Sequence, residues 1–160
     1  SLEEIYTPSI ETLSNASTLA LIKEVNQTGL SIDVLVSNYA TLQKRVNALE
    51  NAIFIPKVPL LYAAKVTEVK NNLDELKILI YGDNLKDKYE TERSDGLNEL
   101  LGGPAWSLWA TTTGATGTHA KQVALAKEEL KTVLTKYTVL ESKVAKIESE
   151  LIELGVIIKN

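Results

Sequence analysis

Few side chains in this sequence have the types and spacing that chemistry needs. The single histidine, His119, lies where the last helical segment should begin. A cation is disfavoured there, so we expect His119 to be solvated or to cap the helix. The carboxylate pairs Glu128-Glu129 and Glu148-Glu150 could hydrolyse a glycosidic bond only if a cleft held two carboxyls roughly 5 to 9.5 Å apart. The helical pattern places these pairs on outward faces, so we expect no catalytic residue.

Metal and phosphate sites are not indicated either. Without cysteine there is no thiolate ligand and no cysteine nucleophile. Helix bundles hold metals with inward Glu and Glu-x-x-His ligands, and the sequence has no Glu-x-x-His. Gly102-Gly103 and Gly114-x-x-Gly117 lack the preceding strand and the lysine of a phosphate-binding loop, so we expect turns. The sequence therefore predicts no metal and no cofactor.

Trp106 and Trp109 are the most distinctive aromatic residues. They are three positions apart and share one helical face. Together with Tyr62 they could form a platform that stacks on sugar rings. Large aromatic side chains near the corner of two helices more often fill a core, and packing against the early first helix and the start of the last helix is the alternative. Both interpretations stay open.

Helices must position these residues, because apolar side chains recur in steps of three and four along most of the chain. The last such seam consists of Val123, Ala126, Leu130, Val133, Tyr137, Leu140, Val144, Ile147, Leu151, Leu154 and Ile158. It predicts a helix over about 119–154, with Thr118 as its N-cap and Gly155 at its left-handed C-terminal end. The charged residues between seam positions are expected to be solvated and to pair weakly along the helix.

A second seam predicts a helix over about 57–81. It consists of Pro59, Tyr62, Val66, Val69, Leu73, Leu76 and Ile80. Pro56 and Pro59 indicate the start of this helix, because proline is tolerated in a first turn. Gly82 indicates its end.

The first third of the chain is ambiguous. Thr7 and Pro8 are typical of a helix start, and the seam that follows is Ile22, Val25, Gly29, Ile32, Leu35, Tyr39, Leu42, Val46, Leu49 and Ile53. Two consecutive steps of three after Gly29 rotate this stripe. Either one helix bends there, or one helix stops and Ser31 caps another.

The predicted fold is all-α, an elongated up-down-up antiparallel bundle of three long helices with short helices in the connection over 82–118. The middle helix is too short to cover the whole first helix. We therefore expect the connection over 82–118 to cover the remainder.

Composition fits one ordinary folded domain over 1–160. Hydrophobic residues make up 44% of the 160 residues and charged residues 24%, which argues against disorder. A net charge of -4 and a pI near 5.1 argue against nucleic acid as a partner. No run of ~18 apolar residues is present, so no membrane span is expected. The chain starts at Ser1 without a leader, and we expect it to have been excised from a larger protein.

Several stretches resemble the C-terminal helical region of bacterial secreted sortilin-like, BNR-repeat β-propeller proteins, which are often labelled glycosyl hydrolases. The likeness covers about residues 75–155. Its motifs are Leu97-Asn98-Glu99-Leu100, Trp106-Ser107-Leu108-Trp109, Thr116-Gly117-Thr118, Ala126-Lys127-Glu128-Glu129 and Glu150-Leu151-Ile152-Glu153-Leu154-Gly155. The strands and aspartate-box turns of a propeller are missing from this sequence. The resemblance therefore implies an appended, β-propeller-associated helical module and an exported location, which is periplasmic, cell-surface or secreted, and it transfers no catalytic residue. A cytoplasmic location stays open.

From these features we expect an accessory module that is not an enzyme. Its partner would be a neighbouring domain of the parent protein or another protein, contacted through leftover apolar surface near the end of the chain, where Ile152, Val156, Ile157 and Ile158 cluster. The alternative is a carbohydrate-binding or hydrolase-associated domain that uses an aromatic surface around Trp106 and Trp109. Self-association through the seams is a further alternative.

Overall fold

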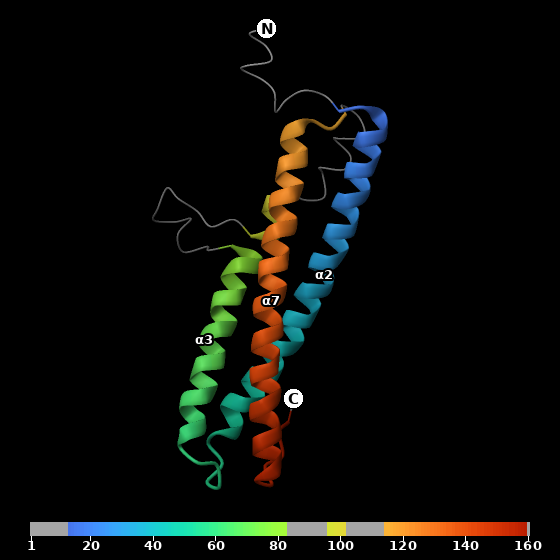
Figure 1. The fold of residues 1–160 in the computed structure, drawn as a ribbon. Coiled ribbons are helices and arrows are strands. Elements are labelled where there is room, and N and C mark those ends of the chain that lie inside the picture. Colours follow the sequence, from blue (N-terminus) through green and yellow to red (C-terminus); the bar gives the residue numbers. More distant parts are fainter. Residues whose placement is uncertain (1–12, 83–95, 102–113, 160) are drawn as a thin grey trace, which may run out of the picture.

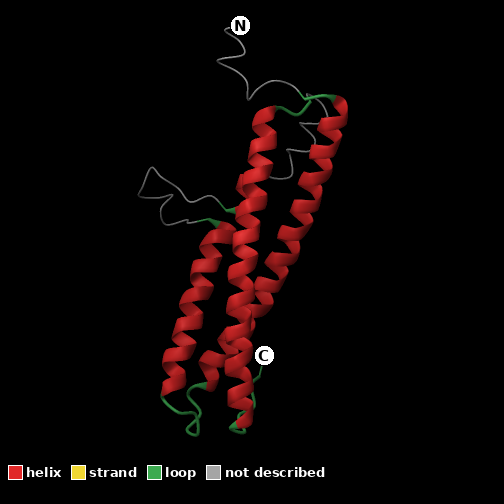
Figure 2. Cartoon of the chain, viewed as in Figure 1, coloured by secondary structure: helices red, strands yellow, loops and turns green. Residues whose placement is uncertain are grey.

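The computed structural model describes residues 13–82, 96–101 and 114–159. Its regular elements are α2 (Asn15–Ala52), α3 (Leu61–Tyr81), α5 (Leu97–Leu100) and α7 (Gly117–Glu153). Figure 2 shows helices and loops, and no strand, in this part of the chain. The long helices α2, α3 and α7 pack against one another, which confirms the predicted all-helical class.

The long helices lie side by side along most of their length (Figure 1). α2 runs from the upper to the lower end of the view, α3 returns partway, and α7 descends again. Ion pairs agree with this course, because Glu24 meets Lys127 near the upper end and Arg45 meets Glu148 near the lower end. α2 and α7 therefore run in the same direction, with α3 opposed to both.

α2 is one continuous helix through Gly29, and its core stripe differs from the predicted seam. The stripe consists of Leu21, Val25, Thr28, Ile32, Leu35, Tyr39, Leu42, Val46 and Leu49. These positions alternate in steps of four and three, so no rotation of the stripe is required. Thr28 occupies the place that was expected for Gly29. Its hydroxyl donates to the carbonyl of Glu24 at 2.8 Å, which satisfies the polar group and leaves the methyl group for the core.

The suggested stop and restart near Gly29 is wrong. Ser31 lies inside α2, and its hydroxyl donates to the carbonyl of Gln27 at 3.1 Å rather than capping a new helix. The N-cap of α2 is Ser14, whose hydroxyl accepts a hydrogen bond from the amide of Ser17. The predicted start at Thr7 and Pro8 lies outside the described residues.

α3 follows its predicted seam closely. Tyr62, Val66, Val69, Leu73, Leu76 and Ile80 are all buried. The helix begins at Leu61 rather than at residue 57, because a residue that precedes proline is disfavoured in the helical region and Val58 precedes Pro59. Gly82 ends the helix with φ of 85°, as predicted.

α7 begins and ends with well-defined caps. Its N-cap is Thr116, so the prediction of Thr118 is wrong by two positions. At the other end the amide of Val156 donates to the carbonyl of Leu151 at 3.0 Å, and Gly155 has φ of 84°. This Schellman motif turns the chain at Gly155, which leaves the predicted seam residue Leu154 exposed.

The described part of the connection between α3 and α7 is built on α5. Leu97 and Leu101 are buried in the common core, and Leu101 lies against Gly29 of α2. Gly96 abuts the last turn of α3 so closely that a Cβ at Gly96 would lie 2.7 Å from the carbonyl oxygen of Ile80. This part of the connection therefore covers the region of α2 that α3 does not reach.

Candidate functional site

Two carboxylates of α7 lie between helices instead of on an outer face. Glu148 accepts hydrogen bonds from the guanidinium of Arg45 on α2, with Nε 3.2 Å from Oε2. Glu150 accepts from the hydroxyl of Tyr62 on α3 at 2.9 Å and lies 3.4 Å from Nζ of Lys65. The expectation that these two carboxylates point outward is wrong. They bind α7 to its two neighbours separately, Glu148 to α2 and Glu150 to α3.

The pKa shifts of Glu150, Tyr62 and Arg45 keep each of these groups in the charge state that it has at neutral pH. The hydrogen bond from Tyr62 lowers the pKa of Glu150 and raises the pKa of Tyr62. The hydrogen bond to Glu148 raises the pKa of Arg45, and burial raises the pKa of Tyr39 to about 12. General acid–base catalysis uses groups that titrate near the working pH. These shifts move groups away from it, so the contacts favour stability over proton transfer.

His119 completes a capping box at the start of α7. Its Nδ1 accepts a hydrogen bond from the amide of Thr116 at 3.0 Å, and its own amide donates to the hydroxyl of Thr116 at 3.5 Å. Glutamate or glutamine is usual at this position. Nδ1 can accept only when it carries no proton, so this geometry requires the neutral ring protonated at Nε2.

We expect this cap to weaken as the pH falls. Burial lowers the pKa of His119 in the folded chain, so the unfolded chain binds the proton first as the pH decreases. The contribution of the cap is therefore complete above about pH 6.5, the ordinary pKa of histidine, and declines below it. Losing a cap lowers the free energy of unfolding by about 1 kcal/mol. Urea unfolding at two pH values, about one pH unit above and about one pH unit below 6.5, would measure this difference.

The control for this prediction is His119→Gln. Glutamine keeps an acceptor at this position and does not titrate, so stability of the variant should lose the part of the pH dependence that His119 contributes. Equal pH dependence in the variant and the parent would show that the imidazole does not act through this cap.

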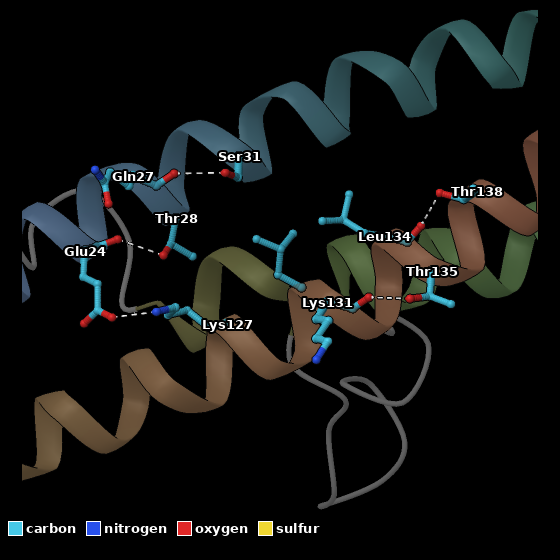
Figure 3. A pocket seen from close by; sticks show the side chains of 10 residues that line it. Glu24, Gln27, Thr28, Ser31, Lys127, Lys131, Leu134, Thr135 and Thr138 are labelled. Carbon is cyan, nitrogen blue, oxygen red and sulfur yellow. Dashed lines mark hydrogen bonds and ion pairs between the residues drawn. The ribbon is translucent and has the colours of Figure 1, made fainter.

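A groove between α2 and α7 forms a hollow in the described surface, with a volume of about 470 Å³. Figure 3 shows side chains of both helices converging on it. The ion pair between Glu24 and Lys127, with Oε1 and Nζ 2.6 Å apart, spans one end. Leu130 and Leu134 contribute apolar surface.

The hydroxyls that line this groove bind their own helices. Thr28, Ser31, Thr135 and Thr138 each donate to the carbonyl four residues earlier. Their donor hydrogens are thus already used, whereas a small-molecule site needs polar groups that converge on the ligand. The groove therefore suits contact with another surface better than orientation of a small substrate.

A second feature is a group of exposed apolar side chains at the lower end of the bundle, where the turn between α2 and α3 lies beside the end of α7 (Figure 1). We call it the apolar end, and it consists of Phe54, Leu60, Leu61, Ile152, Leu154 and Ile157. Leu60 is 92% exposed, Phe54 82% and Ile157 79%. Nζ of Lys57 donates to the carbonyl of Gly155 at 2.7 Å and links the two segments. Large exposed apolar side chains at one end of a bundle are candidates for contact with another surface.

The described residues among those predicted to contact a ligand or partner differ in exposure. Tyr62 belongs to the buried core and binds Glu150, whereas Ile157 is exposed at the apolar end. Ile158 is half-buried and packs against the core. Trp106 and Trp109, including their expected packing against the first and last helices, lie outside the described residues.

Phe54 and Leu60 were missed by the sequence analysis. A signal was present, because residues 52–62 are apolar apart from one lysine and two prolines in a turn where polar residues are usual. Pro56 and Pro59 also predict a helix start, and that prediction does not reveal the exposed side chains of the turn. Of the expected C-terminal cluster, Val156 is buried, because it follows the Schellman turn into the core.

No protein-family model, curated protein or solved structure matches this chain. Within residues 13–82, 96–101 and 114–159, no group of three or more His, Asp or Glu side chains is placed to hold a metal ion. In the same ranges no helix combines the length and the hydropathy needed to cross a membrane. The candidate site is therefore defined by its geometry alone, as the apolar end and the α2–α7 groove.

Proposed function

We propose that this chain is a non-catalytic interaction module, an up-down-up helical bundle that docks through its apolar end on a partner protein or on a neighbouring domain of a larger, exported protein. The exposure of Phe54, Leu60 and Ile157 at one end carries the proposal. Water-exposed side chains of this size and number cost free energy that contact with a partner would recover.

The construction of the bundle supports this function. The helices share one apolar core, and ion pairs also link them, as between Arg45 and Glu148 or between Lys143 and Glu68. The helices thus form a scaffold that presents the turn between α2 and α3 beside the end of α7. The exported location rests on the resemblance of residues 75–155.

Footprinting tests the proposal. The protein is labelled with a carbene reagent in the cells that produce it and, separately, as the purified chain at high dilution. Side chains that are labelled less in the cells are covered there. Phe54, Leu60 and Ile157 should lose most of their labelling in the cells. Leu19 and Leu30 are 67% and 66% exposed and lie outside the apolar end, so they serve as controls. Equal labelling of Phe54, Leu60 and Ile157 in both samples would overturn the proposal.

A further inference from the structure

Another hollow in the described surface lies between the end of α2 and the first half of α3, and we call it the Glu50 hollow. Its volume is about 210 Å³, and it is lined by Glu50, Ile53, Phe54, Val66, Thr67 and Lys70. Ile53 and Val66 supply apolar walls, and the side chain of Phe54 is largely exposed. The space is on the scale of one long side chain.

The carboxylate of Glu50 is only partly paired. Its Oε2 lies 3.2 Å from Nζ of Lys70, whereas its Oε1 is buried and has no hydrogen-bond partner. Among the described side chains that are not exposed, Glu50 is the only charged one with such an atom. A buried polar atom without a partner costs free energy, so a donor that reached this carboxylate would be bound favourably.

The side chains that line the hollow do not supply the missing donor. The hydroxyl of Thr67 donates to the carbonyl of Ala63 at 2.8 Å, and Lys70 already pairs with the other oxygen of Glu50. The three remaining lining side chains are hydrocarbon. The donor would therefore have to enter the hollow from outside.

An arginine side chain has the chemistry that fits these surroundings. The planar fork of its guanidinium matches a carboxylate and stacks on aromatic rings, and both Glu50 and Phe54 line the hollow. Its methylene stem would cover the apolar walls at Ile53 and Val66, which a water molecule in the same place would not do. The carboxylate can present either oxygen, because the last torsion of a glutamate side chain is two-fold.

We propose that the Glu50 hollow binds an arginine side chain of the partner that docks on the apolar end. This inference rests on the proposed function and names the chemistry of the partner. Phe54 belongs to both surfaces, so a partner that covers Phe54 also borders the hollow. Lys70 would compete for the carboxylate, but Asp74 lies four residues later on α3 and can pair with Lys70 instead.

Titration of the purified full chain with a small arginine derivative tests this proposal. Nα-acetyl-arginine methylamide is added, and the methyl NMR signals of Ile53 and Val66 are followed. We expect saturable shifts with a Kd on the order of 1 mM. The citrulline analogue has nearly the same shape without the charge, and its Kd should be at least about tenfold higher.

Variants locate the binding at Glu50. Glu50→Gln should raise the Kd of the arginine derivative at least about tenfold. Lys70→Met should lower this Kd about threefold, because it removes a competing cation. The ion pair of Lys143 and Glu68 has the same N–O separation of 3.2 Å and serves as the control, so Lys143→Met and Glu68→Gln should leave the Kd unchanged.

The other outcomes would overturn the inference. They are unshifted signals of Ile53 and Val66, equal binding of the citrulline analogue, an unchanged Kd in Glu50→Gln, and a Kd that does not fall in Lys70→Met. If circular dichroism shows that Glu50→Gln is unfolded, the citrulline analogue and Lys70→Met decide the question.

Failure of this inference is distinguishable from failure of the proposed function. If the arginine derivative does not bind but Phe54 and Leu60 are protected in cells, the proposed function survives and the partner covers them without an arginine in the hollow. If the derivative binds but Phe54 and Leu60 are labelled equally in both samples, the proposed function is overturned and the guanidinium site remains.

Discussion

Replacing Leu42 with alanine should lower the free energy of unfolding by about 2 to 5 kcal/mol. Leu42 is 0% exposed and belongs to the cluster formed by all three long helices. Removing its branched end loses the transfer free energy of the deleted carbons and leaves a cavity that rigid helices fill only in part. Urea unfolding followed by circular dichroism would measure the loss as a lower midpoint with an unchanged slope.

Leu30→Ala is the matched control on the same helix. Leu30 is 66% exposed, so its truncation should change stability by no more than about 0.5 kcal/mol. Leu42→Met keeps most of the volume and should cost less than about 1.5 kcal/mol. If Leu42→Ala and Leu30→Ala cost the same, Leu42 does not lie in a close-packed core and the arrangement of the helices is wrong.

Gly96→Ala should destabilise the chain by about 1 to 3 kcal/mol, as expected of an overpacked site. The added Cβ would lie 2.7 Å from both the carbonyl oxygen of Ile80 and the carbonyl carbon of Tyr81. Both atoms belong to the backbone and cannot rotate away. Gly96 has φ of -75° and ψ of 167°, which any residue adopts, so the effect would come from the clash alone. Thermal unfolding would report it as a lower Tm.

Gly29→Ala is the control for this substitution and should have the opposite sign. A Cβ at Gly29 would meet Leu101 Cδ2 at 3.8 Å, an ordinary contact, and alanine favours a helix interior over glycine by about 0.5 to 1 kcal/mol. A Tm that falls by the same amount in both variants would show that Gly96 is not tightly packed against the end of α3.

The sequence was sufficient to predict α3 and most of α7, because one apolar stripe of constant period dominates each of them. The sequence did not predict that Thr28 lies in the core, because threonine is a polar residue type that is usually expected outside a core. Only the helix conformation reveals that the hydroxyl can bind the carbonyl of Glu24 and leave a methyl group to pack. The predicted phase slip resulted from assigning Gly29 to that position.

The charged residues were harder to predict than the apolar ones. Pairing along one helix was expected, whereas Lys127 binds Glu24 and Lys143 binds Glu68 on other helices. Which helix lies on which side of α7 depends on the packed arrangement, and periodicity within one helix does not determine it. The apolar end was foreseen only at Ile152 and Ile157, because its other half comes from a distant turn.

The close contact of Gly96 with the end of α3 has a consequence for protein engineering. Gly82 and Gly96, the described residues that flank 83–95, lie against each other, because a Cβ at Gly96 would be 2.9 Å from the amide nitrogen of Gly82. When the two ends of a connecting segment lie close together, the length of the segment has little effect on the stability of the elements that it joins. A fluorescent reporter or an affinity tag could therefore be spliced between Gly82 and Gly96 far from the apolar end, and labelled protein could be followed without blocking the surface that is proposed to bind.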